Sequence, residues 1–264
     1  MRFFAFFLMT SLLLVSHGSG QTIDVRPAQP GKGSLYRPAL IGNSPAALIN
    51  RINSQELIQK GQKDAAVMFT CTVKKTGDVV WSATYRGTPG SKLLEQELLK
   101  ELWGAKFIPA IYNRNPVDAI FYGTVTFAVI DGKPRLRIFA NQETAELKSE
   151  TDFVGPQPFF GNESSFTGWH YPSMQEAPIE VNGAVELALE VTDKGVVSKV
   201  SVRDEEPPFS GFGDAAAYDI GRARFIPAFR EGKPVACKVT LPVYFKRRDE
   251  VFNAPLDIGQ PAGQ

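Results

Sequence analysis

Phe107-Ile108-Pro109-Ala110 occurs a second time as Phe225-Ile226-Pro227-Ala228, 118 positions further along the chain. The neighbouring sequence repeats at the same offset without a gap: Gly77 aligns with Gly195, and 14 of the 61 positions from 67 to 127 are identical to those from 185 to 245. Chance agreement at ordinary composition is about one in fifteen. Because an internal repeat sets the architecture of a chain, the sequence predicts two copies of one small fold rather than one large domain.

Each copy has the pattern of a strand, a glycine turn, a second strand, a helix and a last strand. Alternating apolar residues predict the first strand at 67–73 in one copy and at 185–191 in the other. A leucine at every fourth position from Leu94 to Leu102 predicts an amphipathic helix, and Asp214 is expected to cap a shorter helix in the second copy. The predicted fold class is therefore α+β, with two tandem small domains, each an antiparallel three- to four-stranded sheet with one helix packed on a face.

The segments outside the repeat divide the rest of the chain. Residues 1–20 combine Arg2, an apolar run and small residues, as is typical of a secretory signal peptide. The apolar run of about 13 residues is shorter than a spanning helix requires, so an uncleaved membrane anchor is the weaker alternative. The other expected segments are a flexible lead-in at 21–44, the first domain at 45–140, an aromatic-rich connector at 141–169, the second domain at 170–248 and a disordered tail at 249–264. Such a chain is expected to be exported from the cytoplasm after cleavage of the signal.

Composition argues against several classes of function. The 29 Lys and Arg residues nearly balance the 28 Asp and Glu residues, so no charge draws the protein to nucleic acid. After residue 20 the chain has one histidine, His170, and two cysteines, Cys71 and Cys237, in different copies. These are too few for a zinc site or a catalytic triad, and a disulfide between the copies is the weaker alternative to two free thiols. We therefore expect that the protein binds no metal and no cofactor and is not an enzyme.

The ordered set of motifs resembles the TonB C-terminal domain family. The second copy carries the resemblance best, in the opening strand and Asp-x-Gly turn, the Arg-Phe-Ile-Pro-Ala segment, the Gly-Lys-Pro-Val turn and the final strand, which are residues 185–195, 224–228, 232–235 and 241–245. The first copy matches more loosely, at 105–110 and 115–117.

The resemblance implies a bacterial protein that is periplasmic or secreted and that binds a protein or peptide partner in the periplasm, with an outer-membrane protein as one candidate. In this family the last strand can accept an extended peptide as an added strand, since its exposed N–H and C=O groups supply the affinity. The residues expected to bind are those of the last strand of the second copy, without Pro242, which donates no hydrogen bond: Lys238, Val239, Thr240, Leu241, Val243, Tyr244 and Phe245. In the first copy, the alternating residues 135–139 predict an extra strand that closes the matching edge.

Two other functions remain open from the sequence. One is a membrane-anchored, TonB-type energy-transducing component of outer-membrane transport, which requires the N-terminal segment to stay uncleaved. The other is a structural envelope protein that self-associates edge to edge, for example as a homodimer, and takes no guest peptide.

Overall fold

The structure is a computed structural model that describes residues 35–172 and 181–246. The expected signal peptide at 1–20 and tail at 249–264 lie outside the described residues. The helices are α1 (Leu48–Arg51), α2 (Ser54–Gln59), α3 (Lys92–Leu102), α4 (Thr144–Ser149) and α5 (Phe212–Gly221). The strands are β1 (Tyr36–Arg37), β2 (Ala65–Val73), β3 (Val79–Gly87), β4 (Ala110–Tyr112), β5 (Asn115–Ile130), β6 (Lys133–Phe139), β7 (Gln157–Phe160), β8 (Gly183–Val191), β9 (Val197–Glu206), β10 (Phe225–Ile226), β11 (Ala228–Arg230), β12 (Lys233–Val235) and β13 (Cys237–Phe245). Within the described ranges, no helix is long and apolar enough to cross a bilayer.

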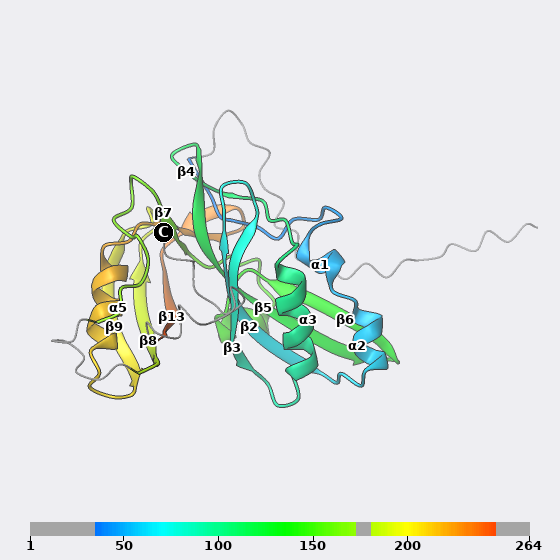
Figure 1. The fold of residues 1–264 in the computed structure, drawn as a ribbon. Coiled ribbons are helices and arrows are strands. Elements are labelled where there is room, and N and C mark those ends of the chain that lie inside the picture. Colours follow the sequence, from blue (N-terminus) through cyan, green and yellow to red (C-terminus); the bar gives the residue numbers. More distant parts are fainter. Residues whose placement is uncertain (1–34, 173–180, 247–264) are drawn as a thin grey trace, which may run out of the picture.

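The strands form antiparallel sheets in two halves of the molecule, and the first half runs from β1 to α4 and the second half from β7 to β13 (Figure 1). The larger sheet has eight strands; its main path is β1-β4-β5-β2-β3, β6 and β7 also pair with β5, and β10 pairs with β7. The smaller sheets are β13-β8-β9 and the hairpin β11-β12. The fold is therefore mixed helix and sheet with antiparallel pairing, as the sequence predicted.

Strand pairings of the first half recur in the second half at the offset of 118. Phe69 faces Gly123 across β2 and β5, and Leu187 faces Leu241 across β8 and β13. The irregularities of β2 against β3 come after Met68 and after Thr72, and those of β8 against β9 come at the equivalent positions, after Glu186 and after Glu190. Since a register slip of one residue would turn the apolar side chains to the wrong face, the shared register keeps the same alternating positions buried in both halves.

The repeated glycine turn fixes the end of the first hairpin in each half. Gly77 and Gly195 have φ values of +85° and +71°, a region that favours glycine. Their carbonyl oxygens accept hydrogen bonds from the N–H groups of Phe107 and Phe225, each at 2.9 Å. The turn therefore holds the start of the Phe-Ile-Pro-Ala segment against the hairpin, which explains why both motifs repeat together.

One helix packs against the first hairpin of each half. Helix α3 lies along β2 and β3, and its leucine stripe is fully buried; α5 lies along β8 and β9 (Figure 1). The predicted capping role of Asp214 is wrong. The residue before α5 is Gly211, whose φ of +77° suits glycine, so the helix begins at Phe212 and Asp214 lies in its first turn. The ring of Phe212 is fully buried, and this burial places the helix start three residues earlier than a cap at Asp214 would.

Each of the two cores contains side chains from both halves, so the expectation of two independent small domains is not confirmed. Ile226 and Phe229 of the second half belong to the core of the first half, and Ile120 and Tyr122 of the first half belong to the core of the second. Strand β10 joins the larger sheet through β7. Each core thus contains apolar side chains from the other half, and the larger sheet extends from β5 through β7 to β10, while β13-β8-β9 remains a sheet of its own.

Parts of the expected lead-in and connector are structural strands. Ala39 to Ile41, expected in a flexible lead-in, are buried, and Leu40 pairs with Ile108. Gln157, expected in a connector, pairs with Ile226 as Leu40 pairs with Ile108. Ile226 follows Ile108 by 118 positions, and Gln157 follows Leu40 by 117. The buried Gln157 amide accepts from the N–H of Ala39 at 2.7 Å and donates to its C=O at 3.0 Å. The leading strand of each half was missed because it is short and irregular in sequence.

Candidate functional site

Strand β13, the predicted binding strand, lies at an edge of its sheet. Among the described residues it pairs along Cys237–Phe245 with β8 on one side, and no other described strand pairs with it. Its alternate residues Val239, Leu241, Val243 and Phe245 are buried against α5. The side chains between them lie on the opposite face, which is turned toward the first half (Figure 1). The edge of β13 therefore opens into the space between the halves.

The hydrogen-bonding direction along this edge follows from Thr240. Its N–H donates to Glu143 Oε1 at 3.0 Å, and its C=O accepts from the side-chain amide of Gln142. Both groups of Thr240 therefore point away from β8. Because these directions alternate along an antiparallel strand, the backbone groups of Lys238, Pro242 and Tyr244 also point outward, with Pro242 offering only its C=O. This orientation is what an added strand requires.

Gln142 and Glu143 thus fill the edge at one position, which corrects the expectation that the whole strand 238–245 is open. Gln142 is held in turn by the hydroxyl of Tyr85 from β3. One amide and one carboxylate together satisfy the N–H and C=O of Thr240, much as one residue of a neighbouring strand would. Beyond this position, toward Phe245, the edge adjoins two cavities.

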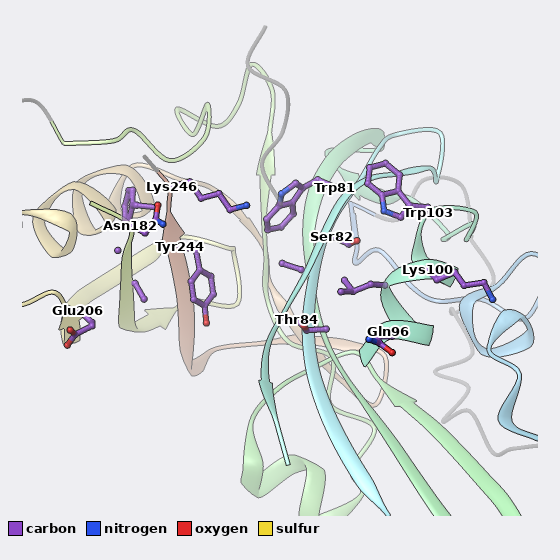
Figure 2. Close-up of a pocket in the computed structure, with 15 residues that line it drawn as sticks. Trp81, Ser82, Thr84, Gln96, Lys100, Trp103, Asn182, Glu206, Tyr244 and Lys246 are labelled. Atoms are coloured by element: carbon purple, nitrogen blue, oxygen red, sulfur yellow. The ribbon is translucent and has the colours of Figure 1, made fainter. Parts of the chain in front are cut away.

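The larger cavity has a volume of about 840 Å³ and lies between the two halves (Figure 2). Its wall on the first half comes from β3 and α3, with the rings of Trp81 and Trp103; its wall on the second half comes from the ends of β8 and β13, with Tyr244. Trp103 and Tyr244 are 44% and 41% exposed. The hydroxyl of Tyr244 reaches the C=O of Tyr85 at 3.4 Å, so the edge of β3 faces the same groove. Exposed aromatic rings gathered in a groove are typical of a surface that binds another molecule.

Charged residues cross the smaller cavity of about 400 Å³, which lies beside Thr240 and Pro242. Arg86 of β3 contacts Glu186 of β8 at 3.2 Å, and Arg203 of β9 contacts the same carboxylate at 3.6 Å. Burial raises the pKa of Glu143, an effect that the hydrogen bond from Thr240 and the charge of Arg203 oppose. Burial also raises the pKa of Tyr85 and of Tyr244.

The matching edge in the first half is closed, as the sequence predicted. Strand β6 pairs with β5 from Ile130↔Lys133 to Thr124↔Phe139, and its Leu136 and Ile138 are buried. The halves thus differ in how the edge of the last strand is covered. Strand β5 has a strand on each side, whereas β13, among the described residues, has a strand on one side and the side chains of Gln142 and Glu143 on the other.

The described residues include the two cysteines and the histidine that the sequence analysis singled out. No cluster of three metal-ligating side chains occurs among them. Cys71 is buried and Cys237 partly buried, and both thiols are free; burial raises the pKa of Cys237 to about 12, so it is a poor nucleophile. His170 pairs with Asp219, with Nδ1 at 2.8 Å from Oδ1, on the surface of α5.

Sequence reasoning named the strand but missed the residues that face it. The groove residues Trp81 and Trp103 and the capping residues Gln142 and Glu143 come from the first half, far along the chain from β13; the two capping residues are 98 and 97 positions from Thr240. No local pattern marks such contacts.

Comparison with known proteins supports the resemblance for the second half. Residues 169–247 match the family described as Gram-negative bacterial TonB protein C-terminal. The match covers α5, β8 to β13 and the segment before them, and this is less than a third of the chain. No curated protein matches the sequence closely enough to count as a relative.

Proposed function

We propose that this protein is an exported cell-envelope protein that binds an extended segment of another polypeptide at the edge of β13. The observation that carries the proposal is the outward-facing backbone of Pro242 and Tyr244, which adjoins a groove lined by exposed aromatic rings. The family match of the second half supports a periplasmic location and a protein partner, with outer-membrane proteins as candidates. The role is binding rather than catalysis.

The recurrence of the strand pairings supports a further part of the proposal, that the chain carries two tandem copies of a TonB C-terminal-like fold. In this view the first copy, with its edge closed by β6, is the support, and the second copy is the binding module. The first copy also contributes one wall of the groove through β3 and α3, so we propose that the two copies act as one unit.

A selection from random peptides tests the binding edge whatever the natural partner is. A phage-displayed library of random twelve-residue peptides is selected on the immobilised full chain, and the enriched peptides are compared on two variants. Tyr244→Ala removes the ring and keeps the outward N–H, whereas Tyr244→Pro removes both. Since the N–H of Tyr244 points away from β8, neither change should break the ladder with β8, and circular dichroism checks that both variants fold.

We expect the enriched peptides to bind Tyr244→Ala within a few-fold of the unmodified chain and to bind Tyr244→Pro at least tenfold more weakly. Protection of the Tyr244 amide from hydrogen exchange should accompany binding. Peptides that bind both variants equally well, or a selection that enriches nothing, would remove strand addition at β13 as the function.

A further inference from the structure

The chain contains its own example of a strand bound to this kind of edge, and the example specifies what the open edge should accept. This inference rests on the proposed function and concerns the direction, register and side-chain pattern of the guest. We propose that β13 takes an antiparallel strand with apolar residues two positions apart, in the register that β6 has on β5.

The equivalence of β5 and β13 fixes the register. Both strands pair with their neighbours β2 and β8 at positions that differ by 118. Strand β6 covers the other side of β5 from Thr124 onward. Adding 118 places the corresponding guest along β13 from Pro242 onward, where Pro242 lines the smaller cavity and Tyr244 and Phe245 line the groove.

The capping residues mark the same limit independently. Strand β6 ends with Phe139 opposite Thr124, the equivalent of Pro242. In the second half, the next outward-facing residue in the direction of Cys237 is Thr240, and the side chains of Gln142 and Glu143 already fill it. A guest in the β6 register would end beside these two side chains without displacing them.

The residues under the guest predict its side-chain pattern. In the first half, Ile138 lies opposite Val125 and Leu136 lies opposite Phe127, and both guest-like side chains are buried. The equivalents of Val125 and Phe127 are the identical residues Val243 and Phe245. The ring of Phe245 stacks on Phe212 at 4.8 Å and meets Tyr171 at 6.4 Å.

Guest residues opposite Val243 and Phe245 therefore continue an apolar face, and apolar side chains there gain from burial. The guest residues between them lie on the face of Pro242 and Tyr244, toward the groove. In β6 the equivalent residues are Phe139 and Arg137, so an aromatic or long side chain suits these positions.

Pro242 is the one residue of this edge that weakens binding relative to the first half. Its equivalent, Thr124, has an N–H that points toward β6, whereas Pro242 has none. The guest therefore forms one hydrogen bond fewer than β6 does. This difference predicts reversible capture of the guest, and it offers a variant that should improve binding.

The test uses a synthetic peptide with the sequence of residues 132–140, added to the full chain and followed by NMR. We expect the Tyr244 amide to become protected from exchange while the Thr240 amide changes little. Pro242→Thr should bind the peptide about fivefold more tightly, the effect of one added hydrogen bond. A control peptide in which Leu136 and Ile138 are both replaced by Ser should bind at least tenfold more weakly. A spin label at the peptide's C-terminus should broaden signals near Thr240, and a label at its N-terminus should not.

Each contrary result has a distinct meaning. Equal binding of the control peptide overturns the apolar pattern, the opposite spin-label result overturns the antiparallel direction, and displacement of the Gln142 and Glu143 contacts overturns the register. Perturbation of β5 signals at Thr126 instead of β13 signals would show exchange with β6 and would also overturn the inference. If the 132–140 peptide fails while library peptides still protect Tyr244, this inference fails and the proposed function stands; if no peptide protects Tyr244, both fail.

Discussion

At the scale of single residues, two glycines of the second half show how one turn differs from another. Gly195 and Gly232 have the same φ of +71°. A Cβ on Gly195 would lie 1.8 Å from the carbonyl oxygen of Phe225, whereas a Cβ on Gly232 would meet nothing within 4 Å. The first glycine is therefore required by contact as well as by conformation, and the second by conformation alone.

We expect Gly195→Ala to lower the free energy of unfolding by about 3 kcal/mol or more, because the backbone contact with Phe225 has to break as well. Gly232→Ala, the matched control, should cost about 1 kcal/mol, the usual penalty for a left-handed alanine. Urea denaturation of the two variants measures the difference. Equal losses would show that the close approach of Gly195 to Phe225 has no role in stability.

The buried carboxylate of Glu143 makes the stability of the folded protein depend on pH. Burial raises its pKa in the folded protein above the ordinary value of 4.5. The folded state therefore holds the proton more strongly than the unfolded state, and the stability contributed by this group is present below pH 4.5 and lost as the pH rises through the folded pKa. Glu146, one turn further on, has the opposite sign, since its hydrogen bond from Arg230 lowers its pKa.

Replacing each glutamate by glutamine should separate these two effects. Glu143→Gln keeps an acceptor for Thr240 and removes the ionisation, so we expect it to gain stability relative to the unmodified chain as the pH rises from 4.5 toward 7. Glu146→Gln should lose stability relative to the unmodified chain over the range in which that chain ionises Glu146, from low pH up to 4.5. Urea midpoints at a series of pH values test both; the same sign for the two variants would contradict the burial of Glu143.

At the scale of the elements, β7 joins the two halves both through a buried side chain and through strand pairing. Gln157 is buried and exchanges two hydrogen bonds with the backbone of Ala39, which belongs to the leading segment of the first half. Strand β7 also pairs with β5 and with β10. A short strand with little intrinsic preference is thus held by three different partners.

Gln157→Leu should therefore be costly although it preserves volume. It leaves the buried N–H and C=O of Ala39 without partners, and each such group costs about 1–3 kcal/mol, so we expect a loss of about 2–6 kcal/mol. Gln142→Leu, a similar change at a partly exposed site, should cost less. Thermal unfolding by circular dichroism ranks the two, and a larger loss for Gln142→Leu would contradict this account of β7.

The elements also show what the sequence could and could not predict. The hairpins, both packed helices and the closing strand β6 follow from alternation, from the leucine spacing and from glycine at positive φ, which are local signals. Strands β1 and β7 escaped because each is two to four residues long and gains its stability from distant partners. The edge of β13 was predictable from the repeat, whereas its capping by Gln142 and Glu143 depends on a contact between the halves that has no local trace.

At the scale of the whole molecule, the halves repeat in pairing but are joined in packing. Each core contains side chains from the other half, and one sheet runs from β5 through β7 to β10. An ancestral pair of independent units would unfold in two steps. The observed packing predicts a single unfolding transition, because unfolding of either half removes apolar side chains that pack in the core of the other.

Phe225→Ala tests this cooperativity, since Phe225 is fully buried in the second half while the next residue, Ile226, lies in the core of the first. We expect a loss of about 3–5 kcal/mol, with hydrogen exchange by mass spectrometry showing equal destabilisation of β2 in the first half and β8 in the second. Val80→Ala, at a position 42% exposed on β3, should change both by less than about 1 kcal/mol. If β8 lost its protection at lower urea than β2, the halves would unfold separately, and the groove between them would be a junction of two independent domains. A single transition would instead mean that the support of the first half and the binding edge of the second are maintained by the same folding equilibrium.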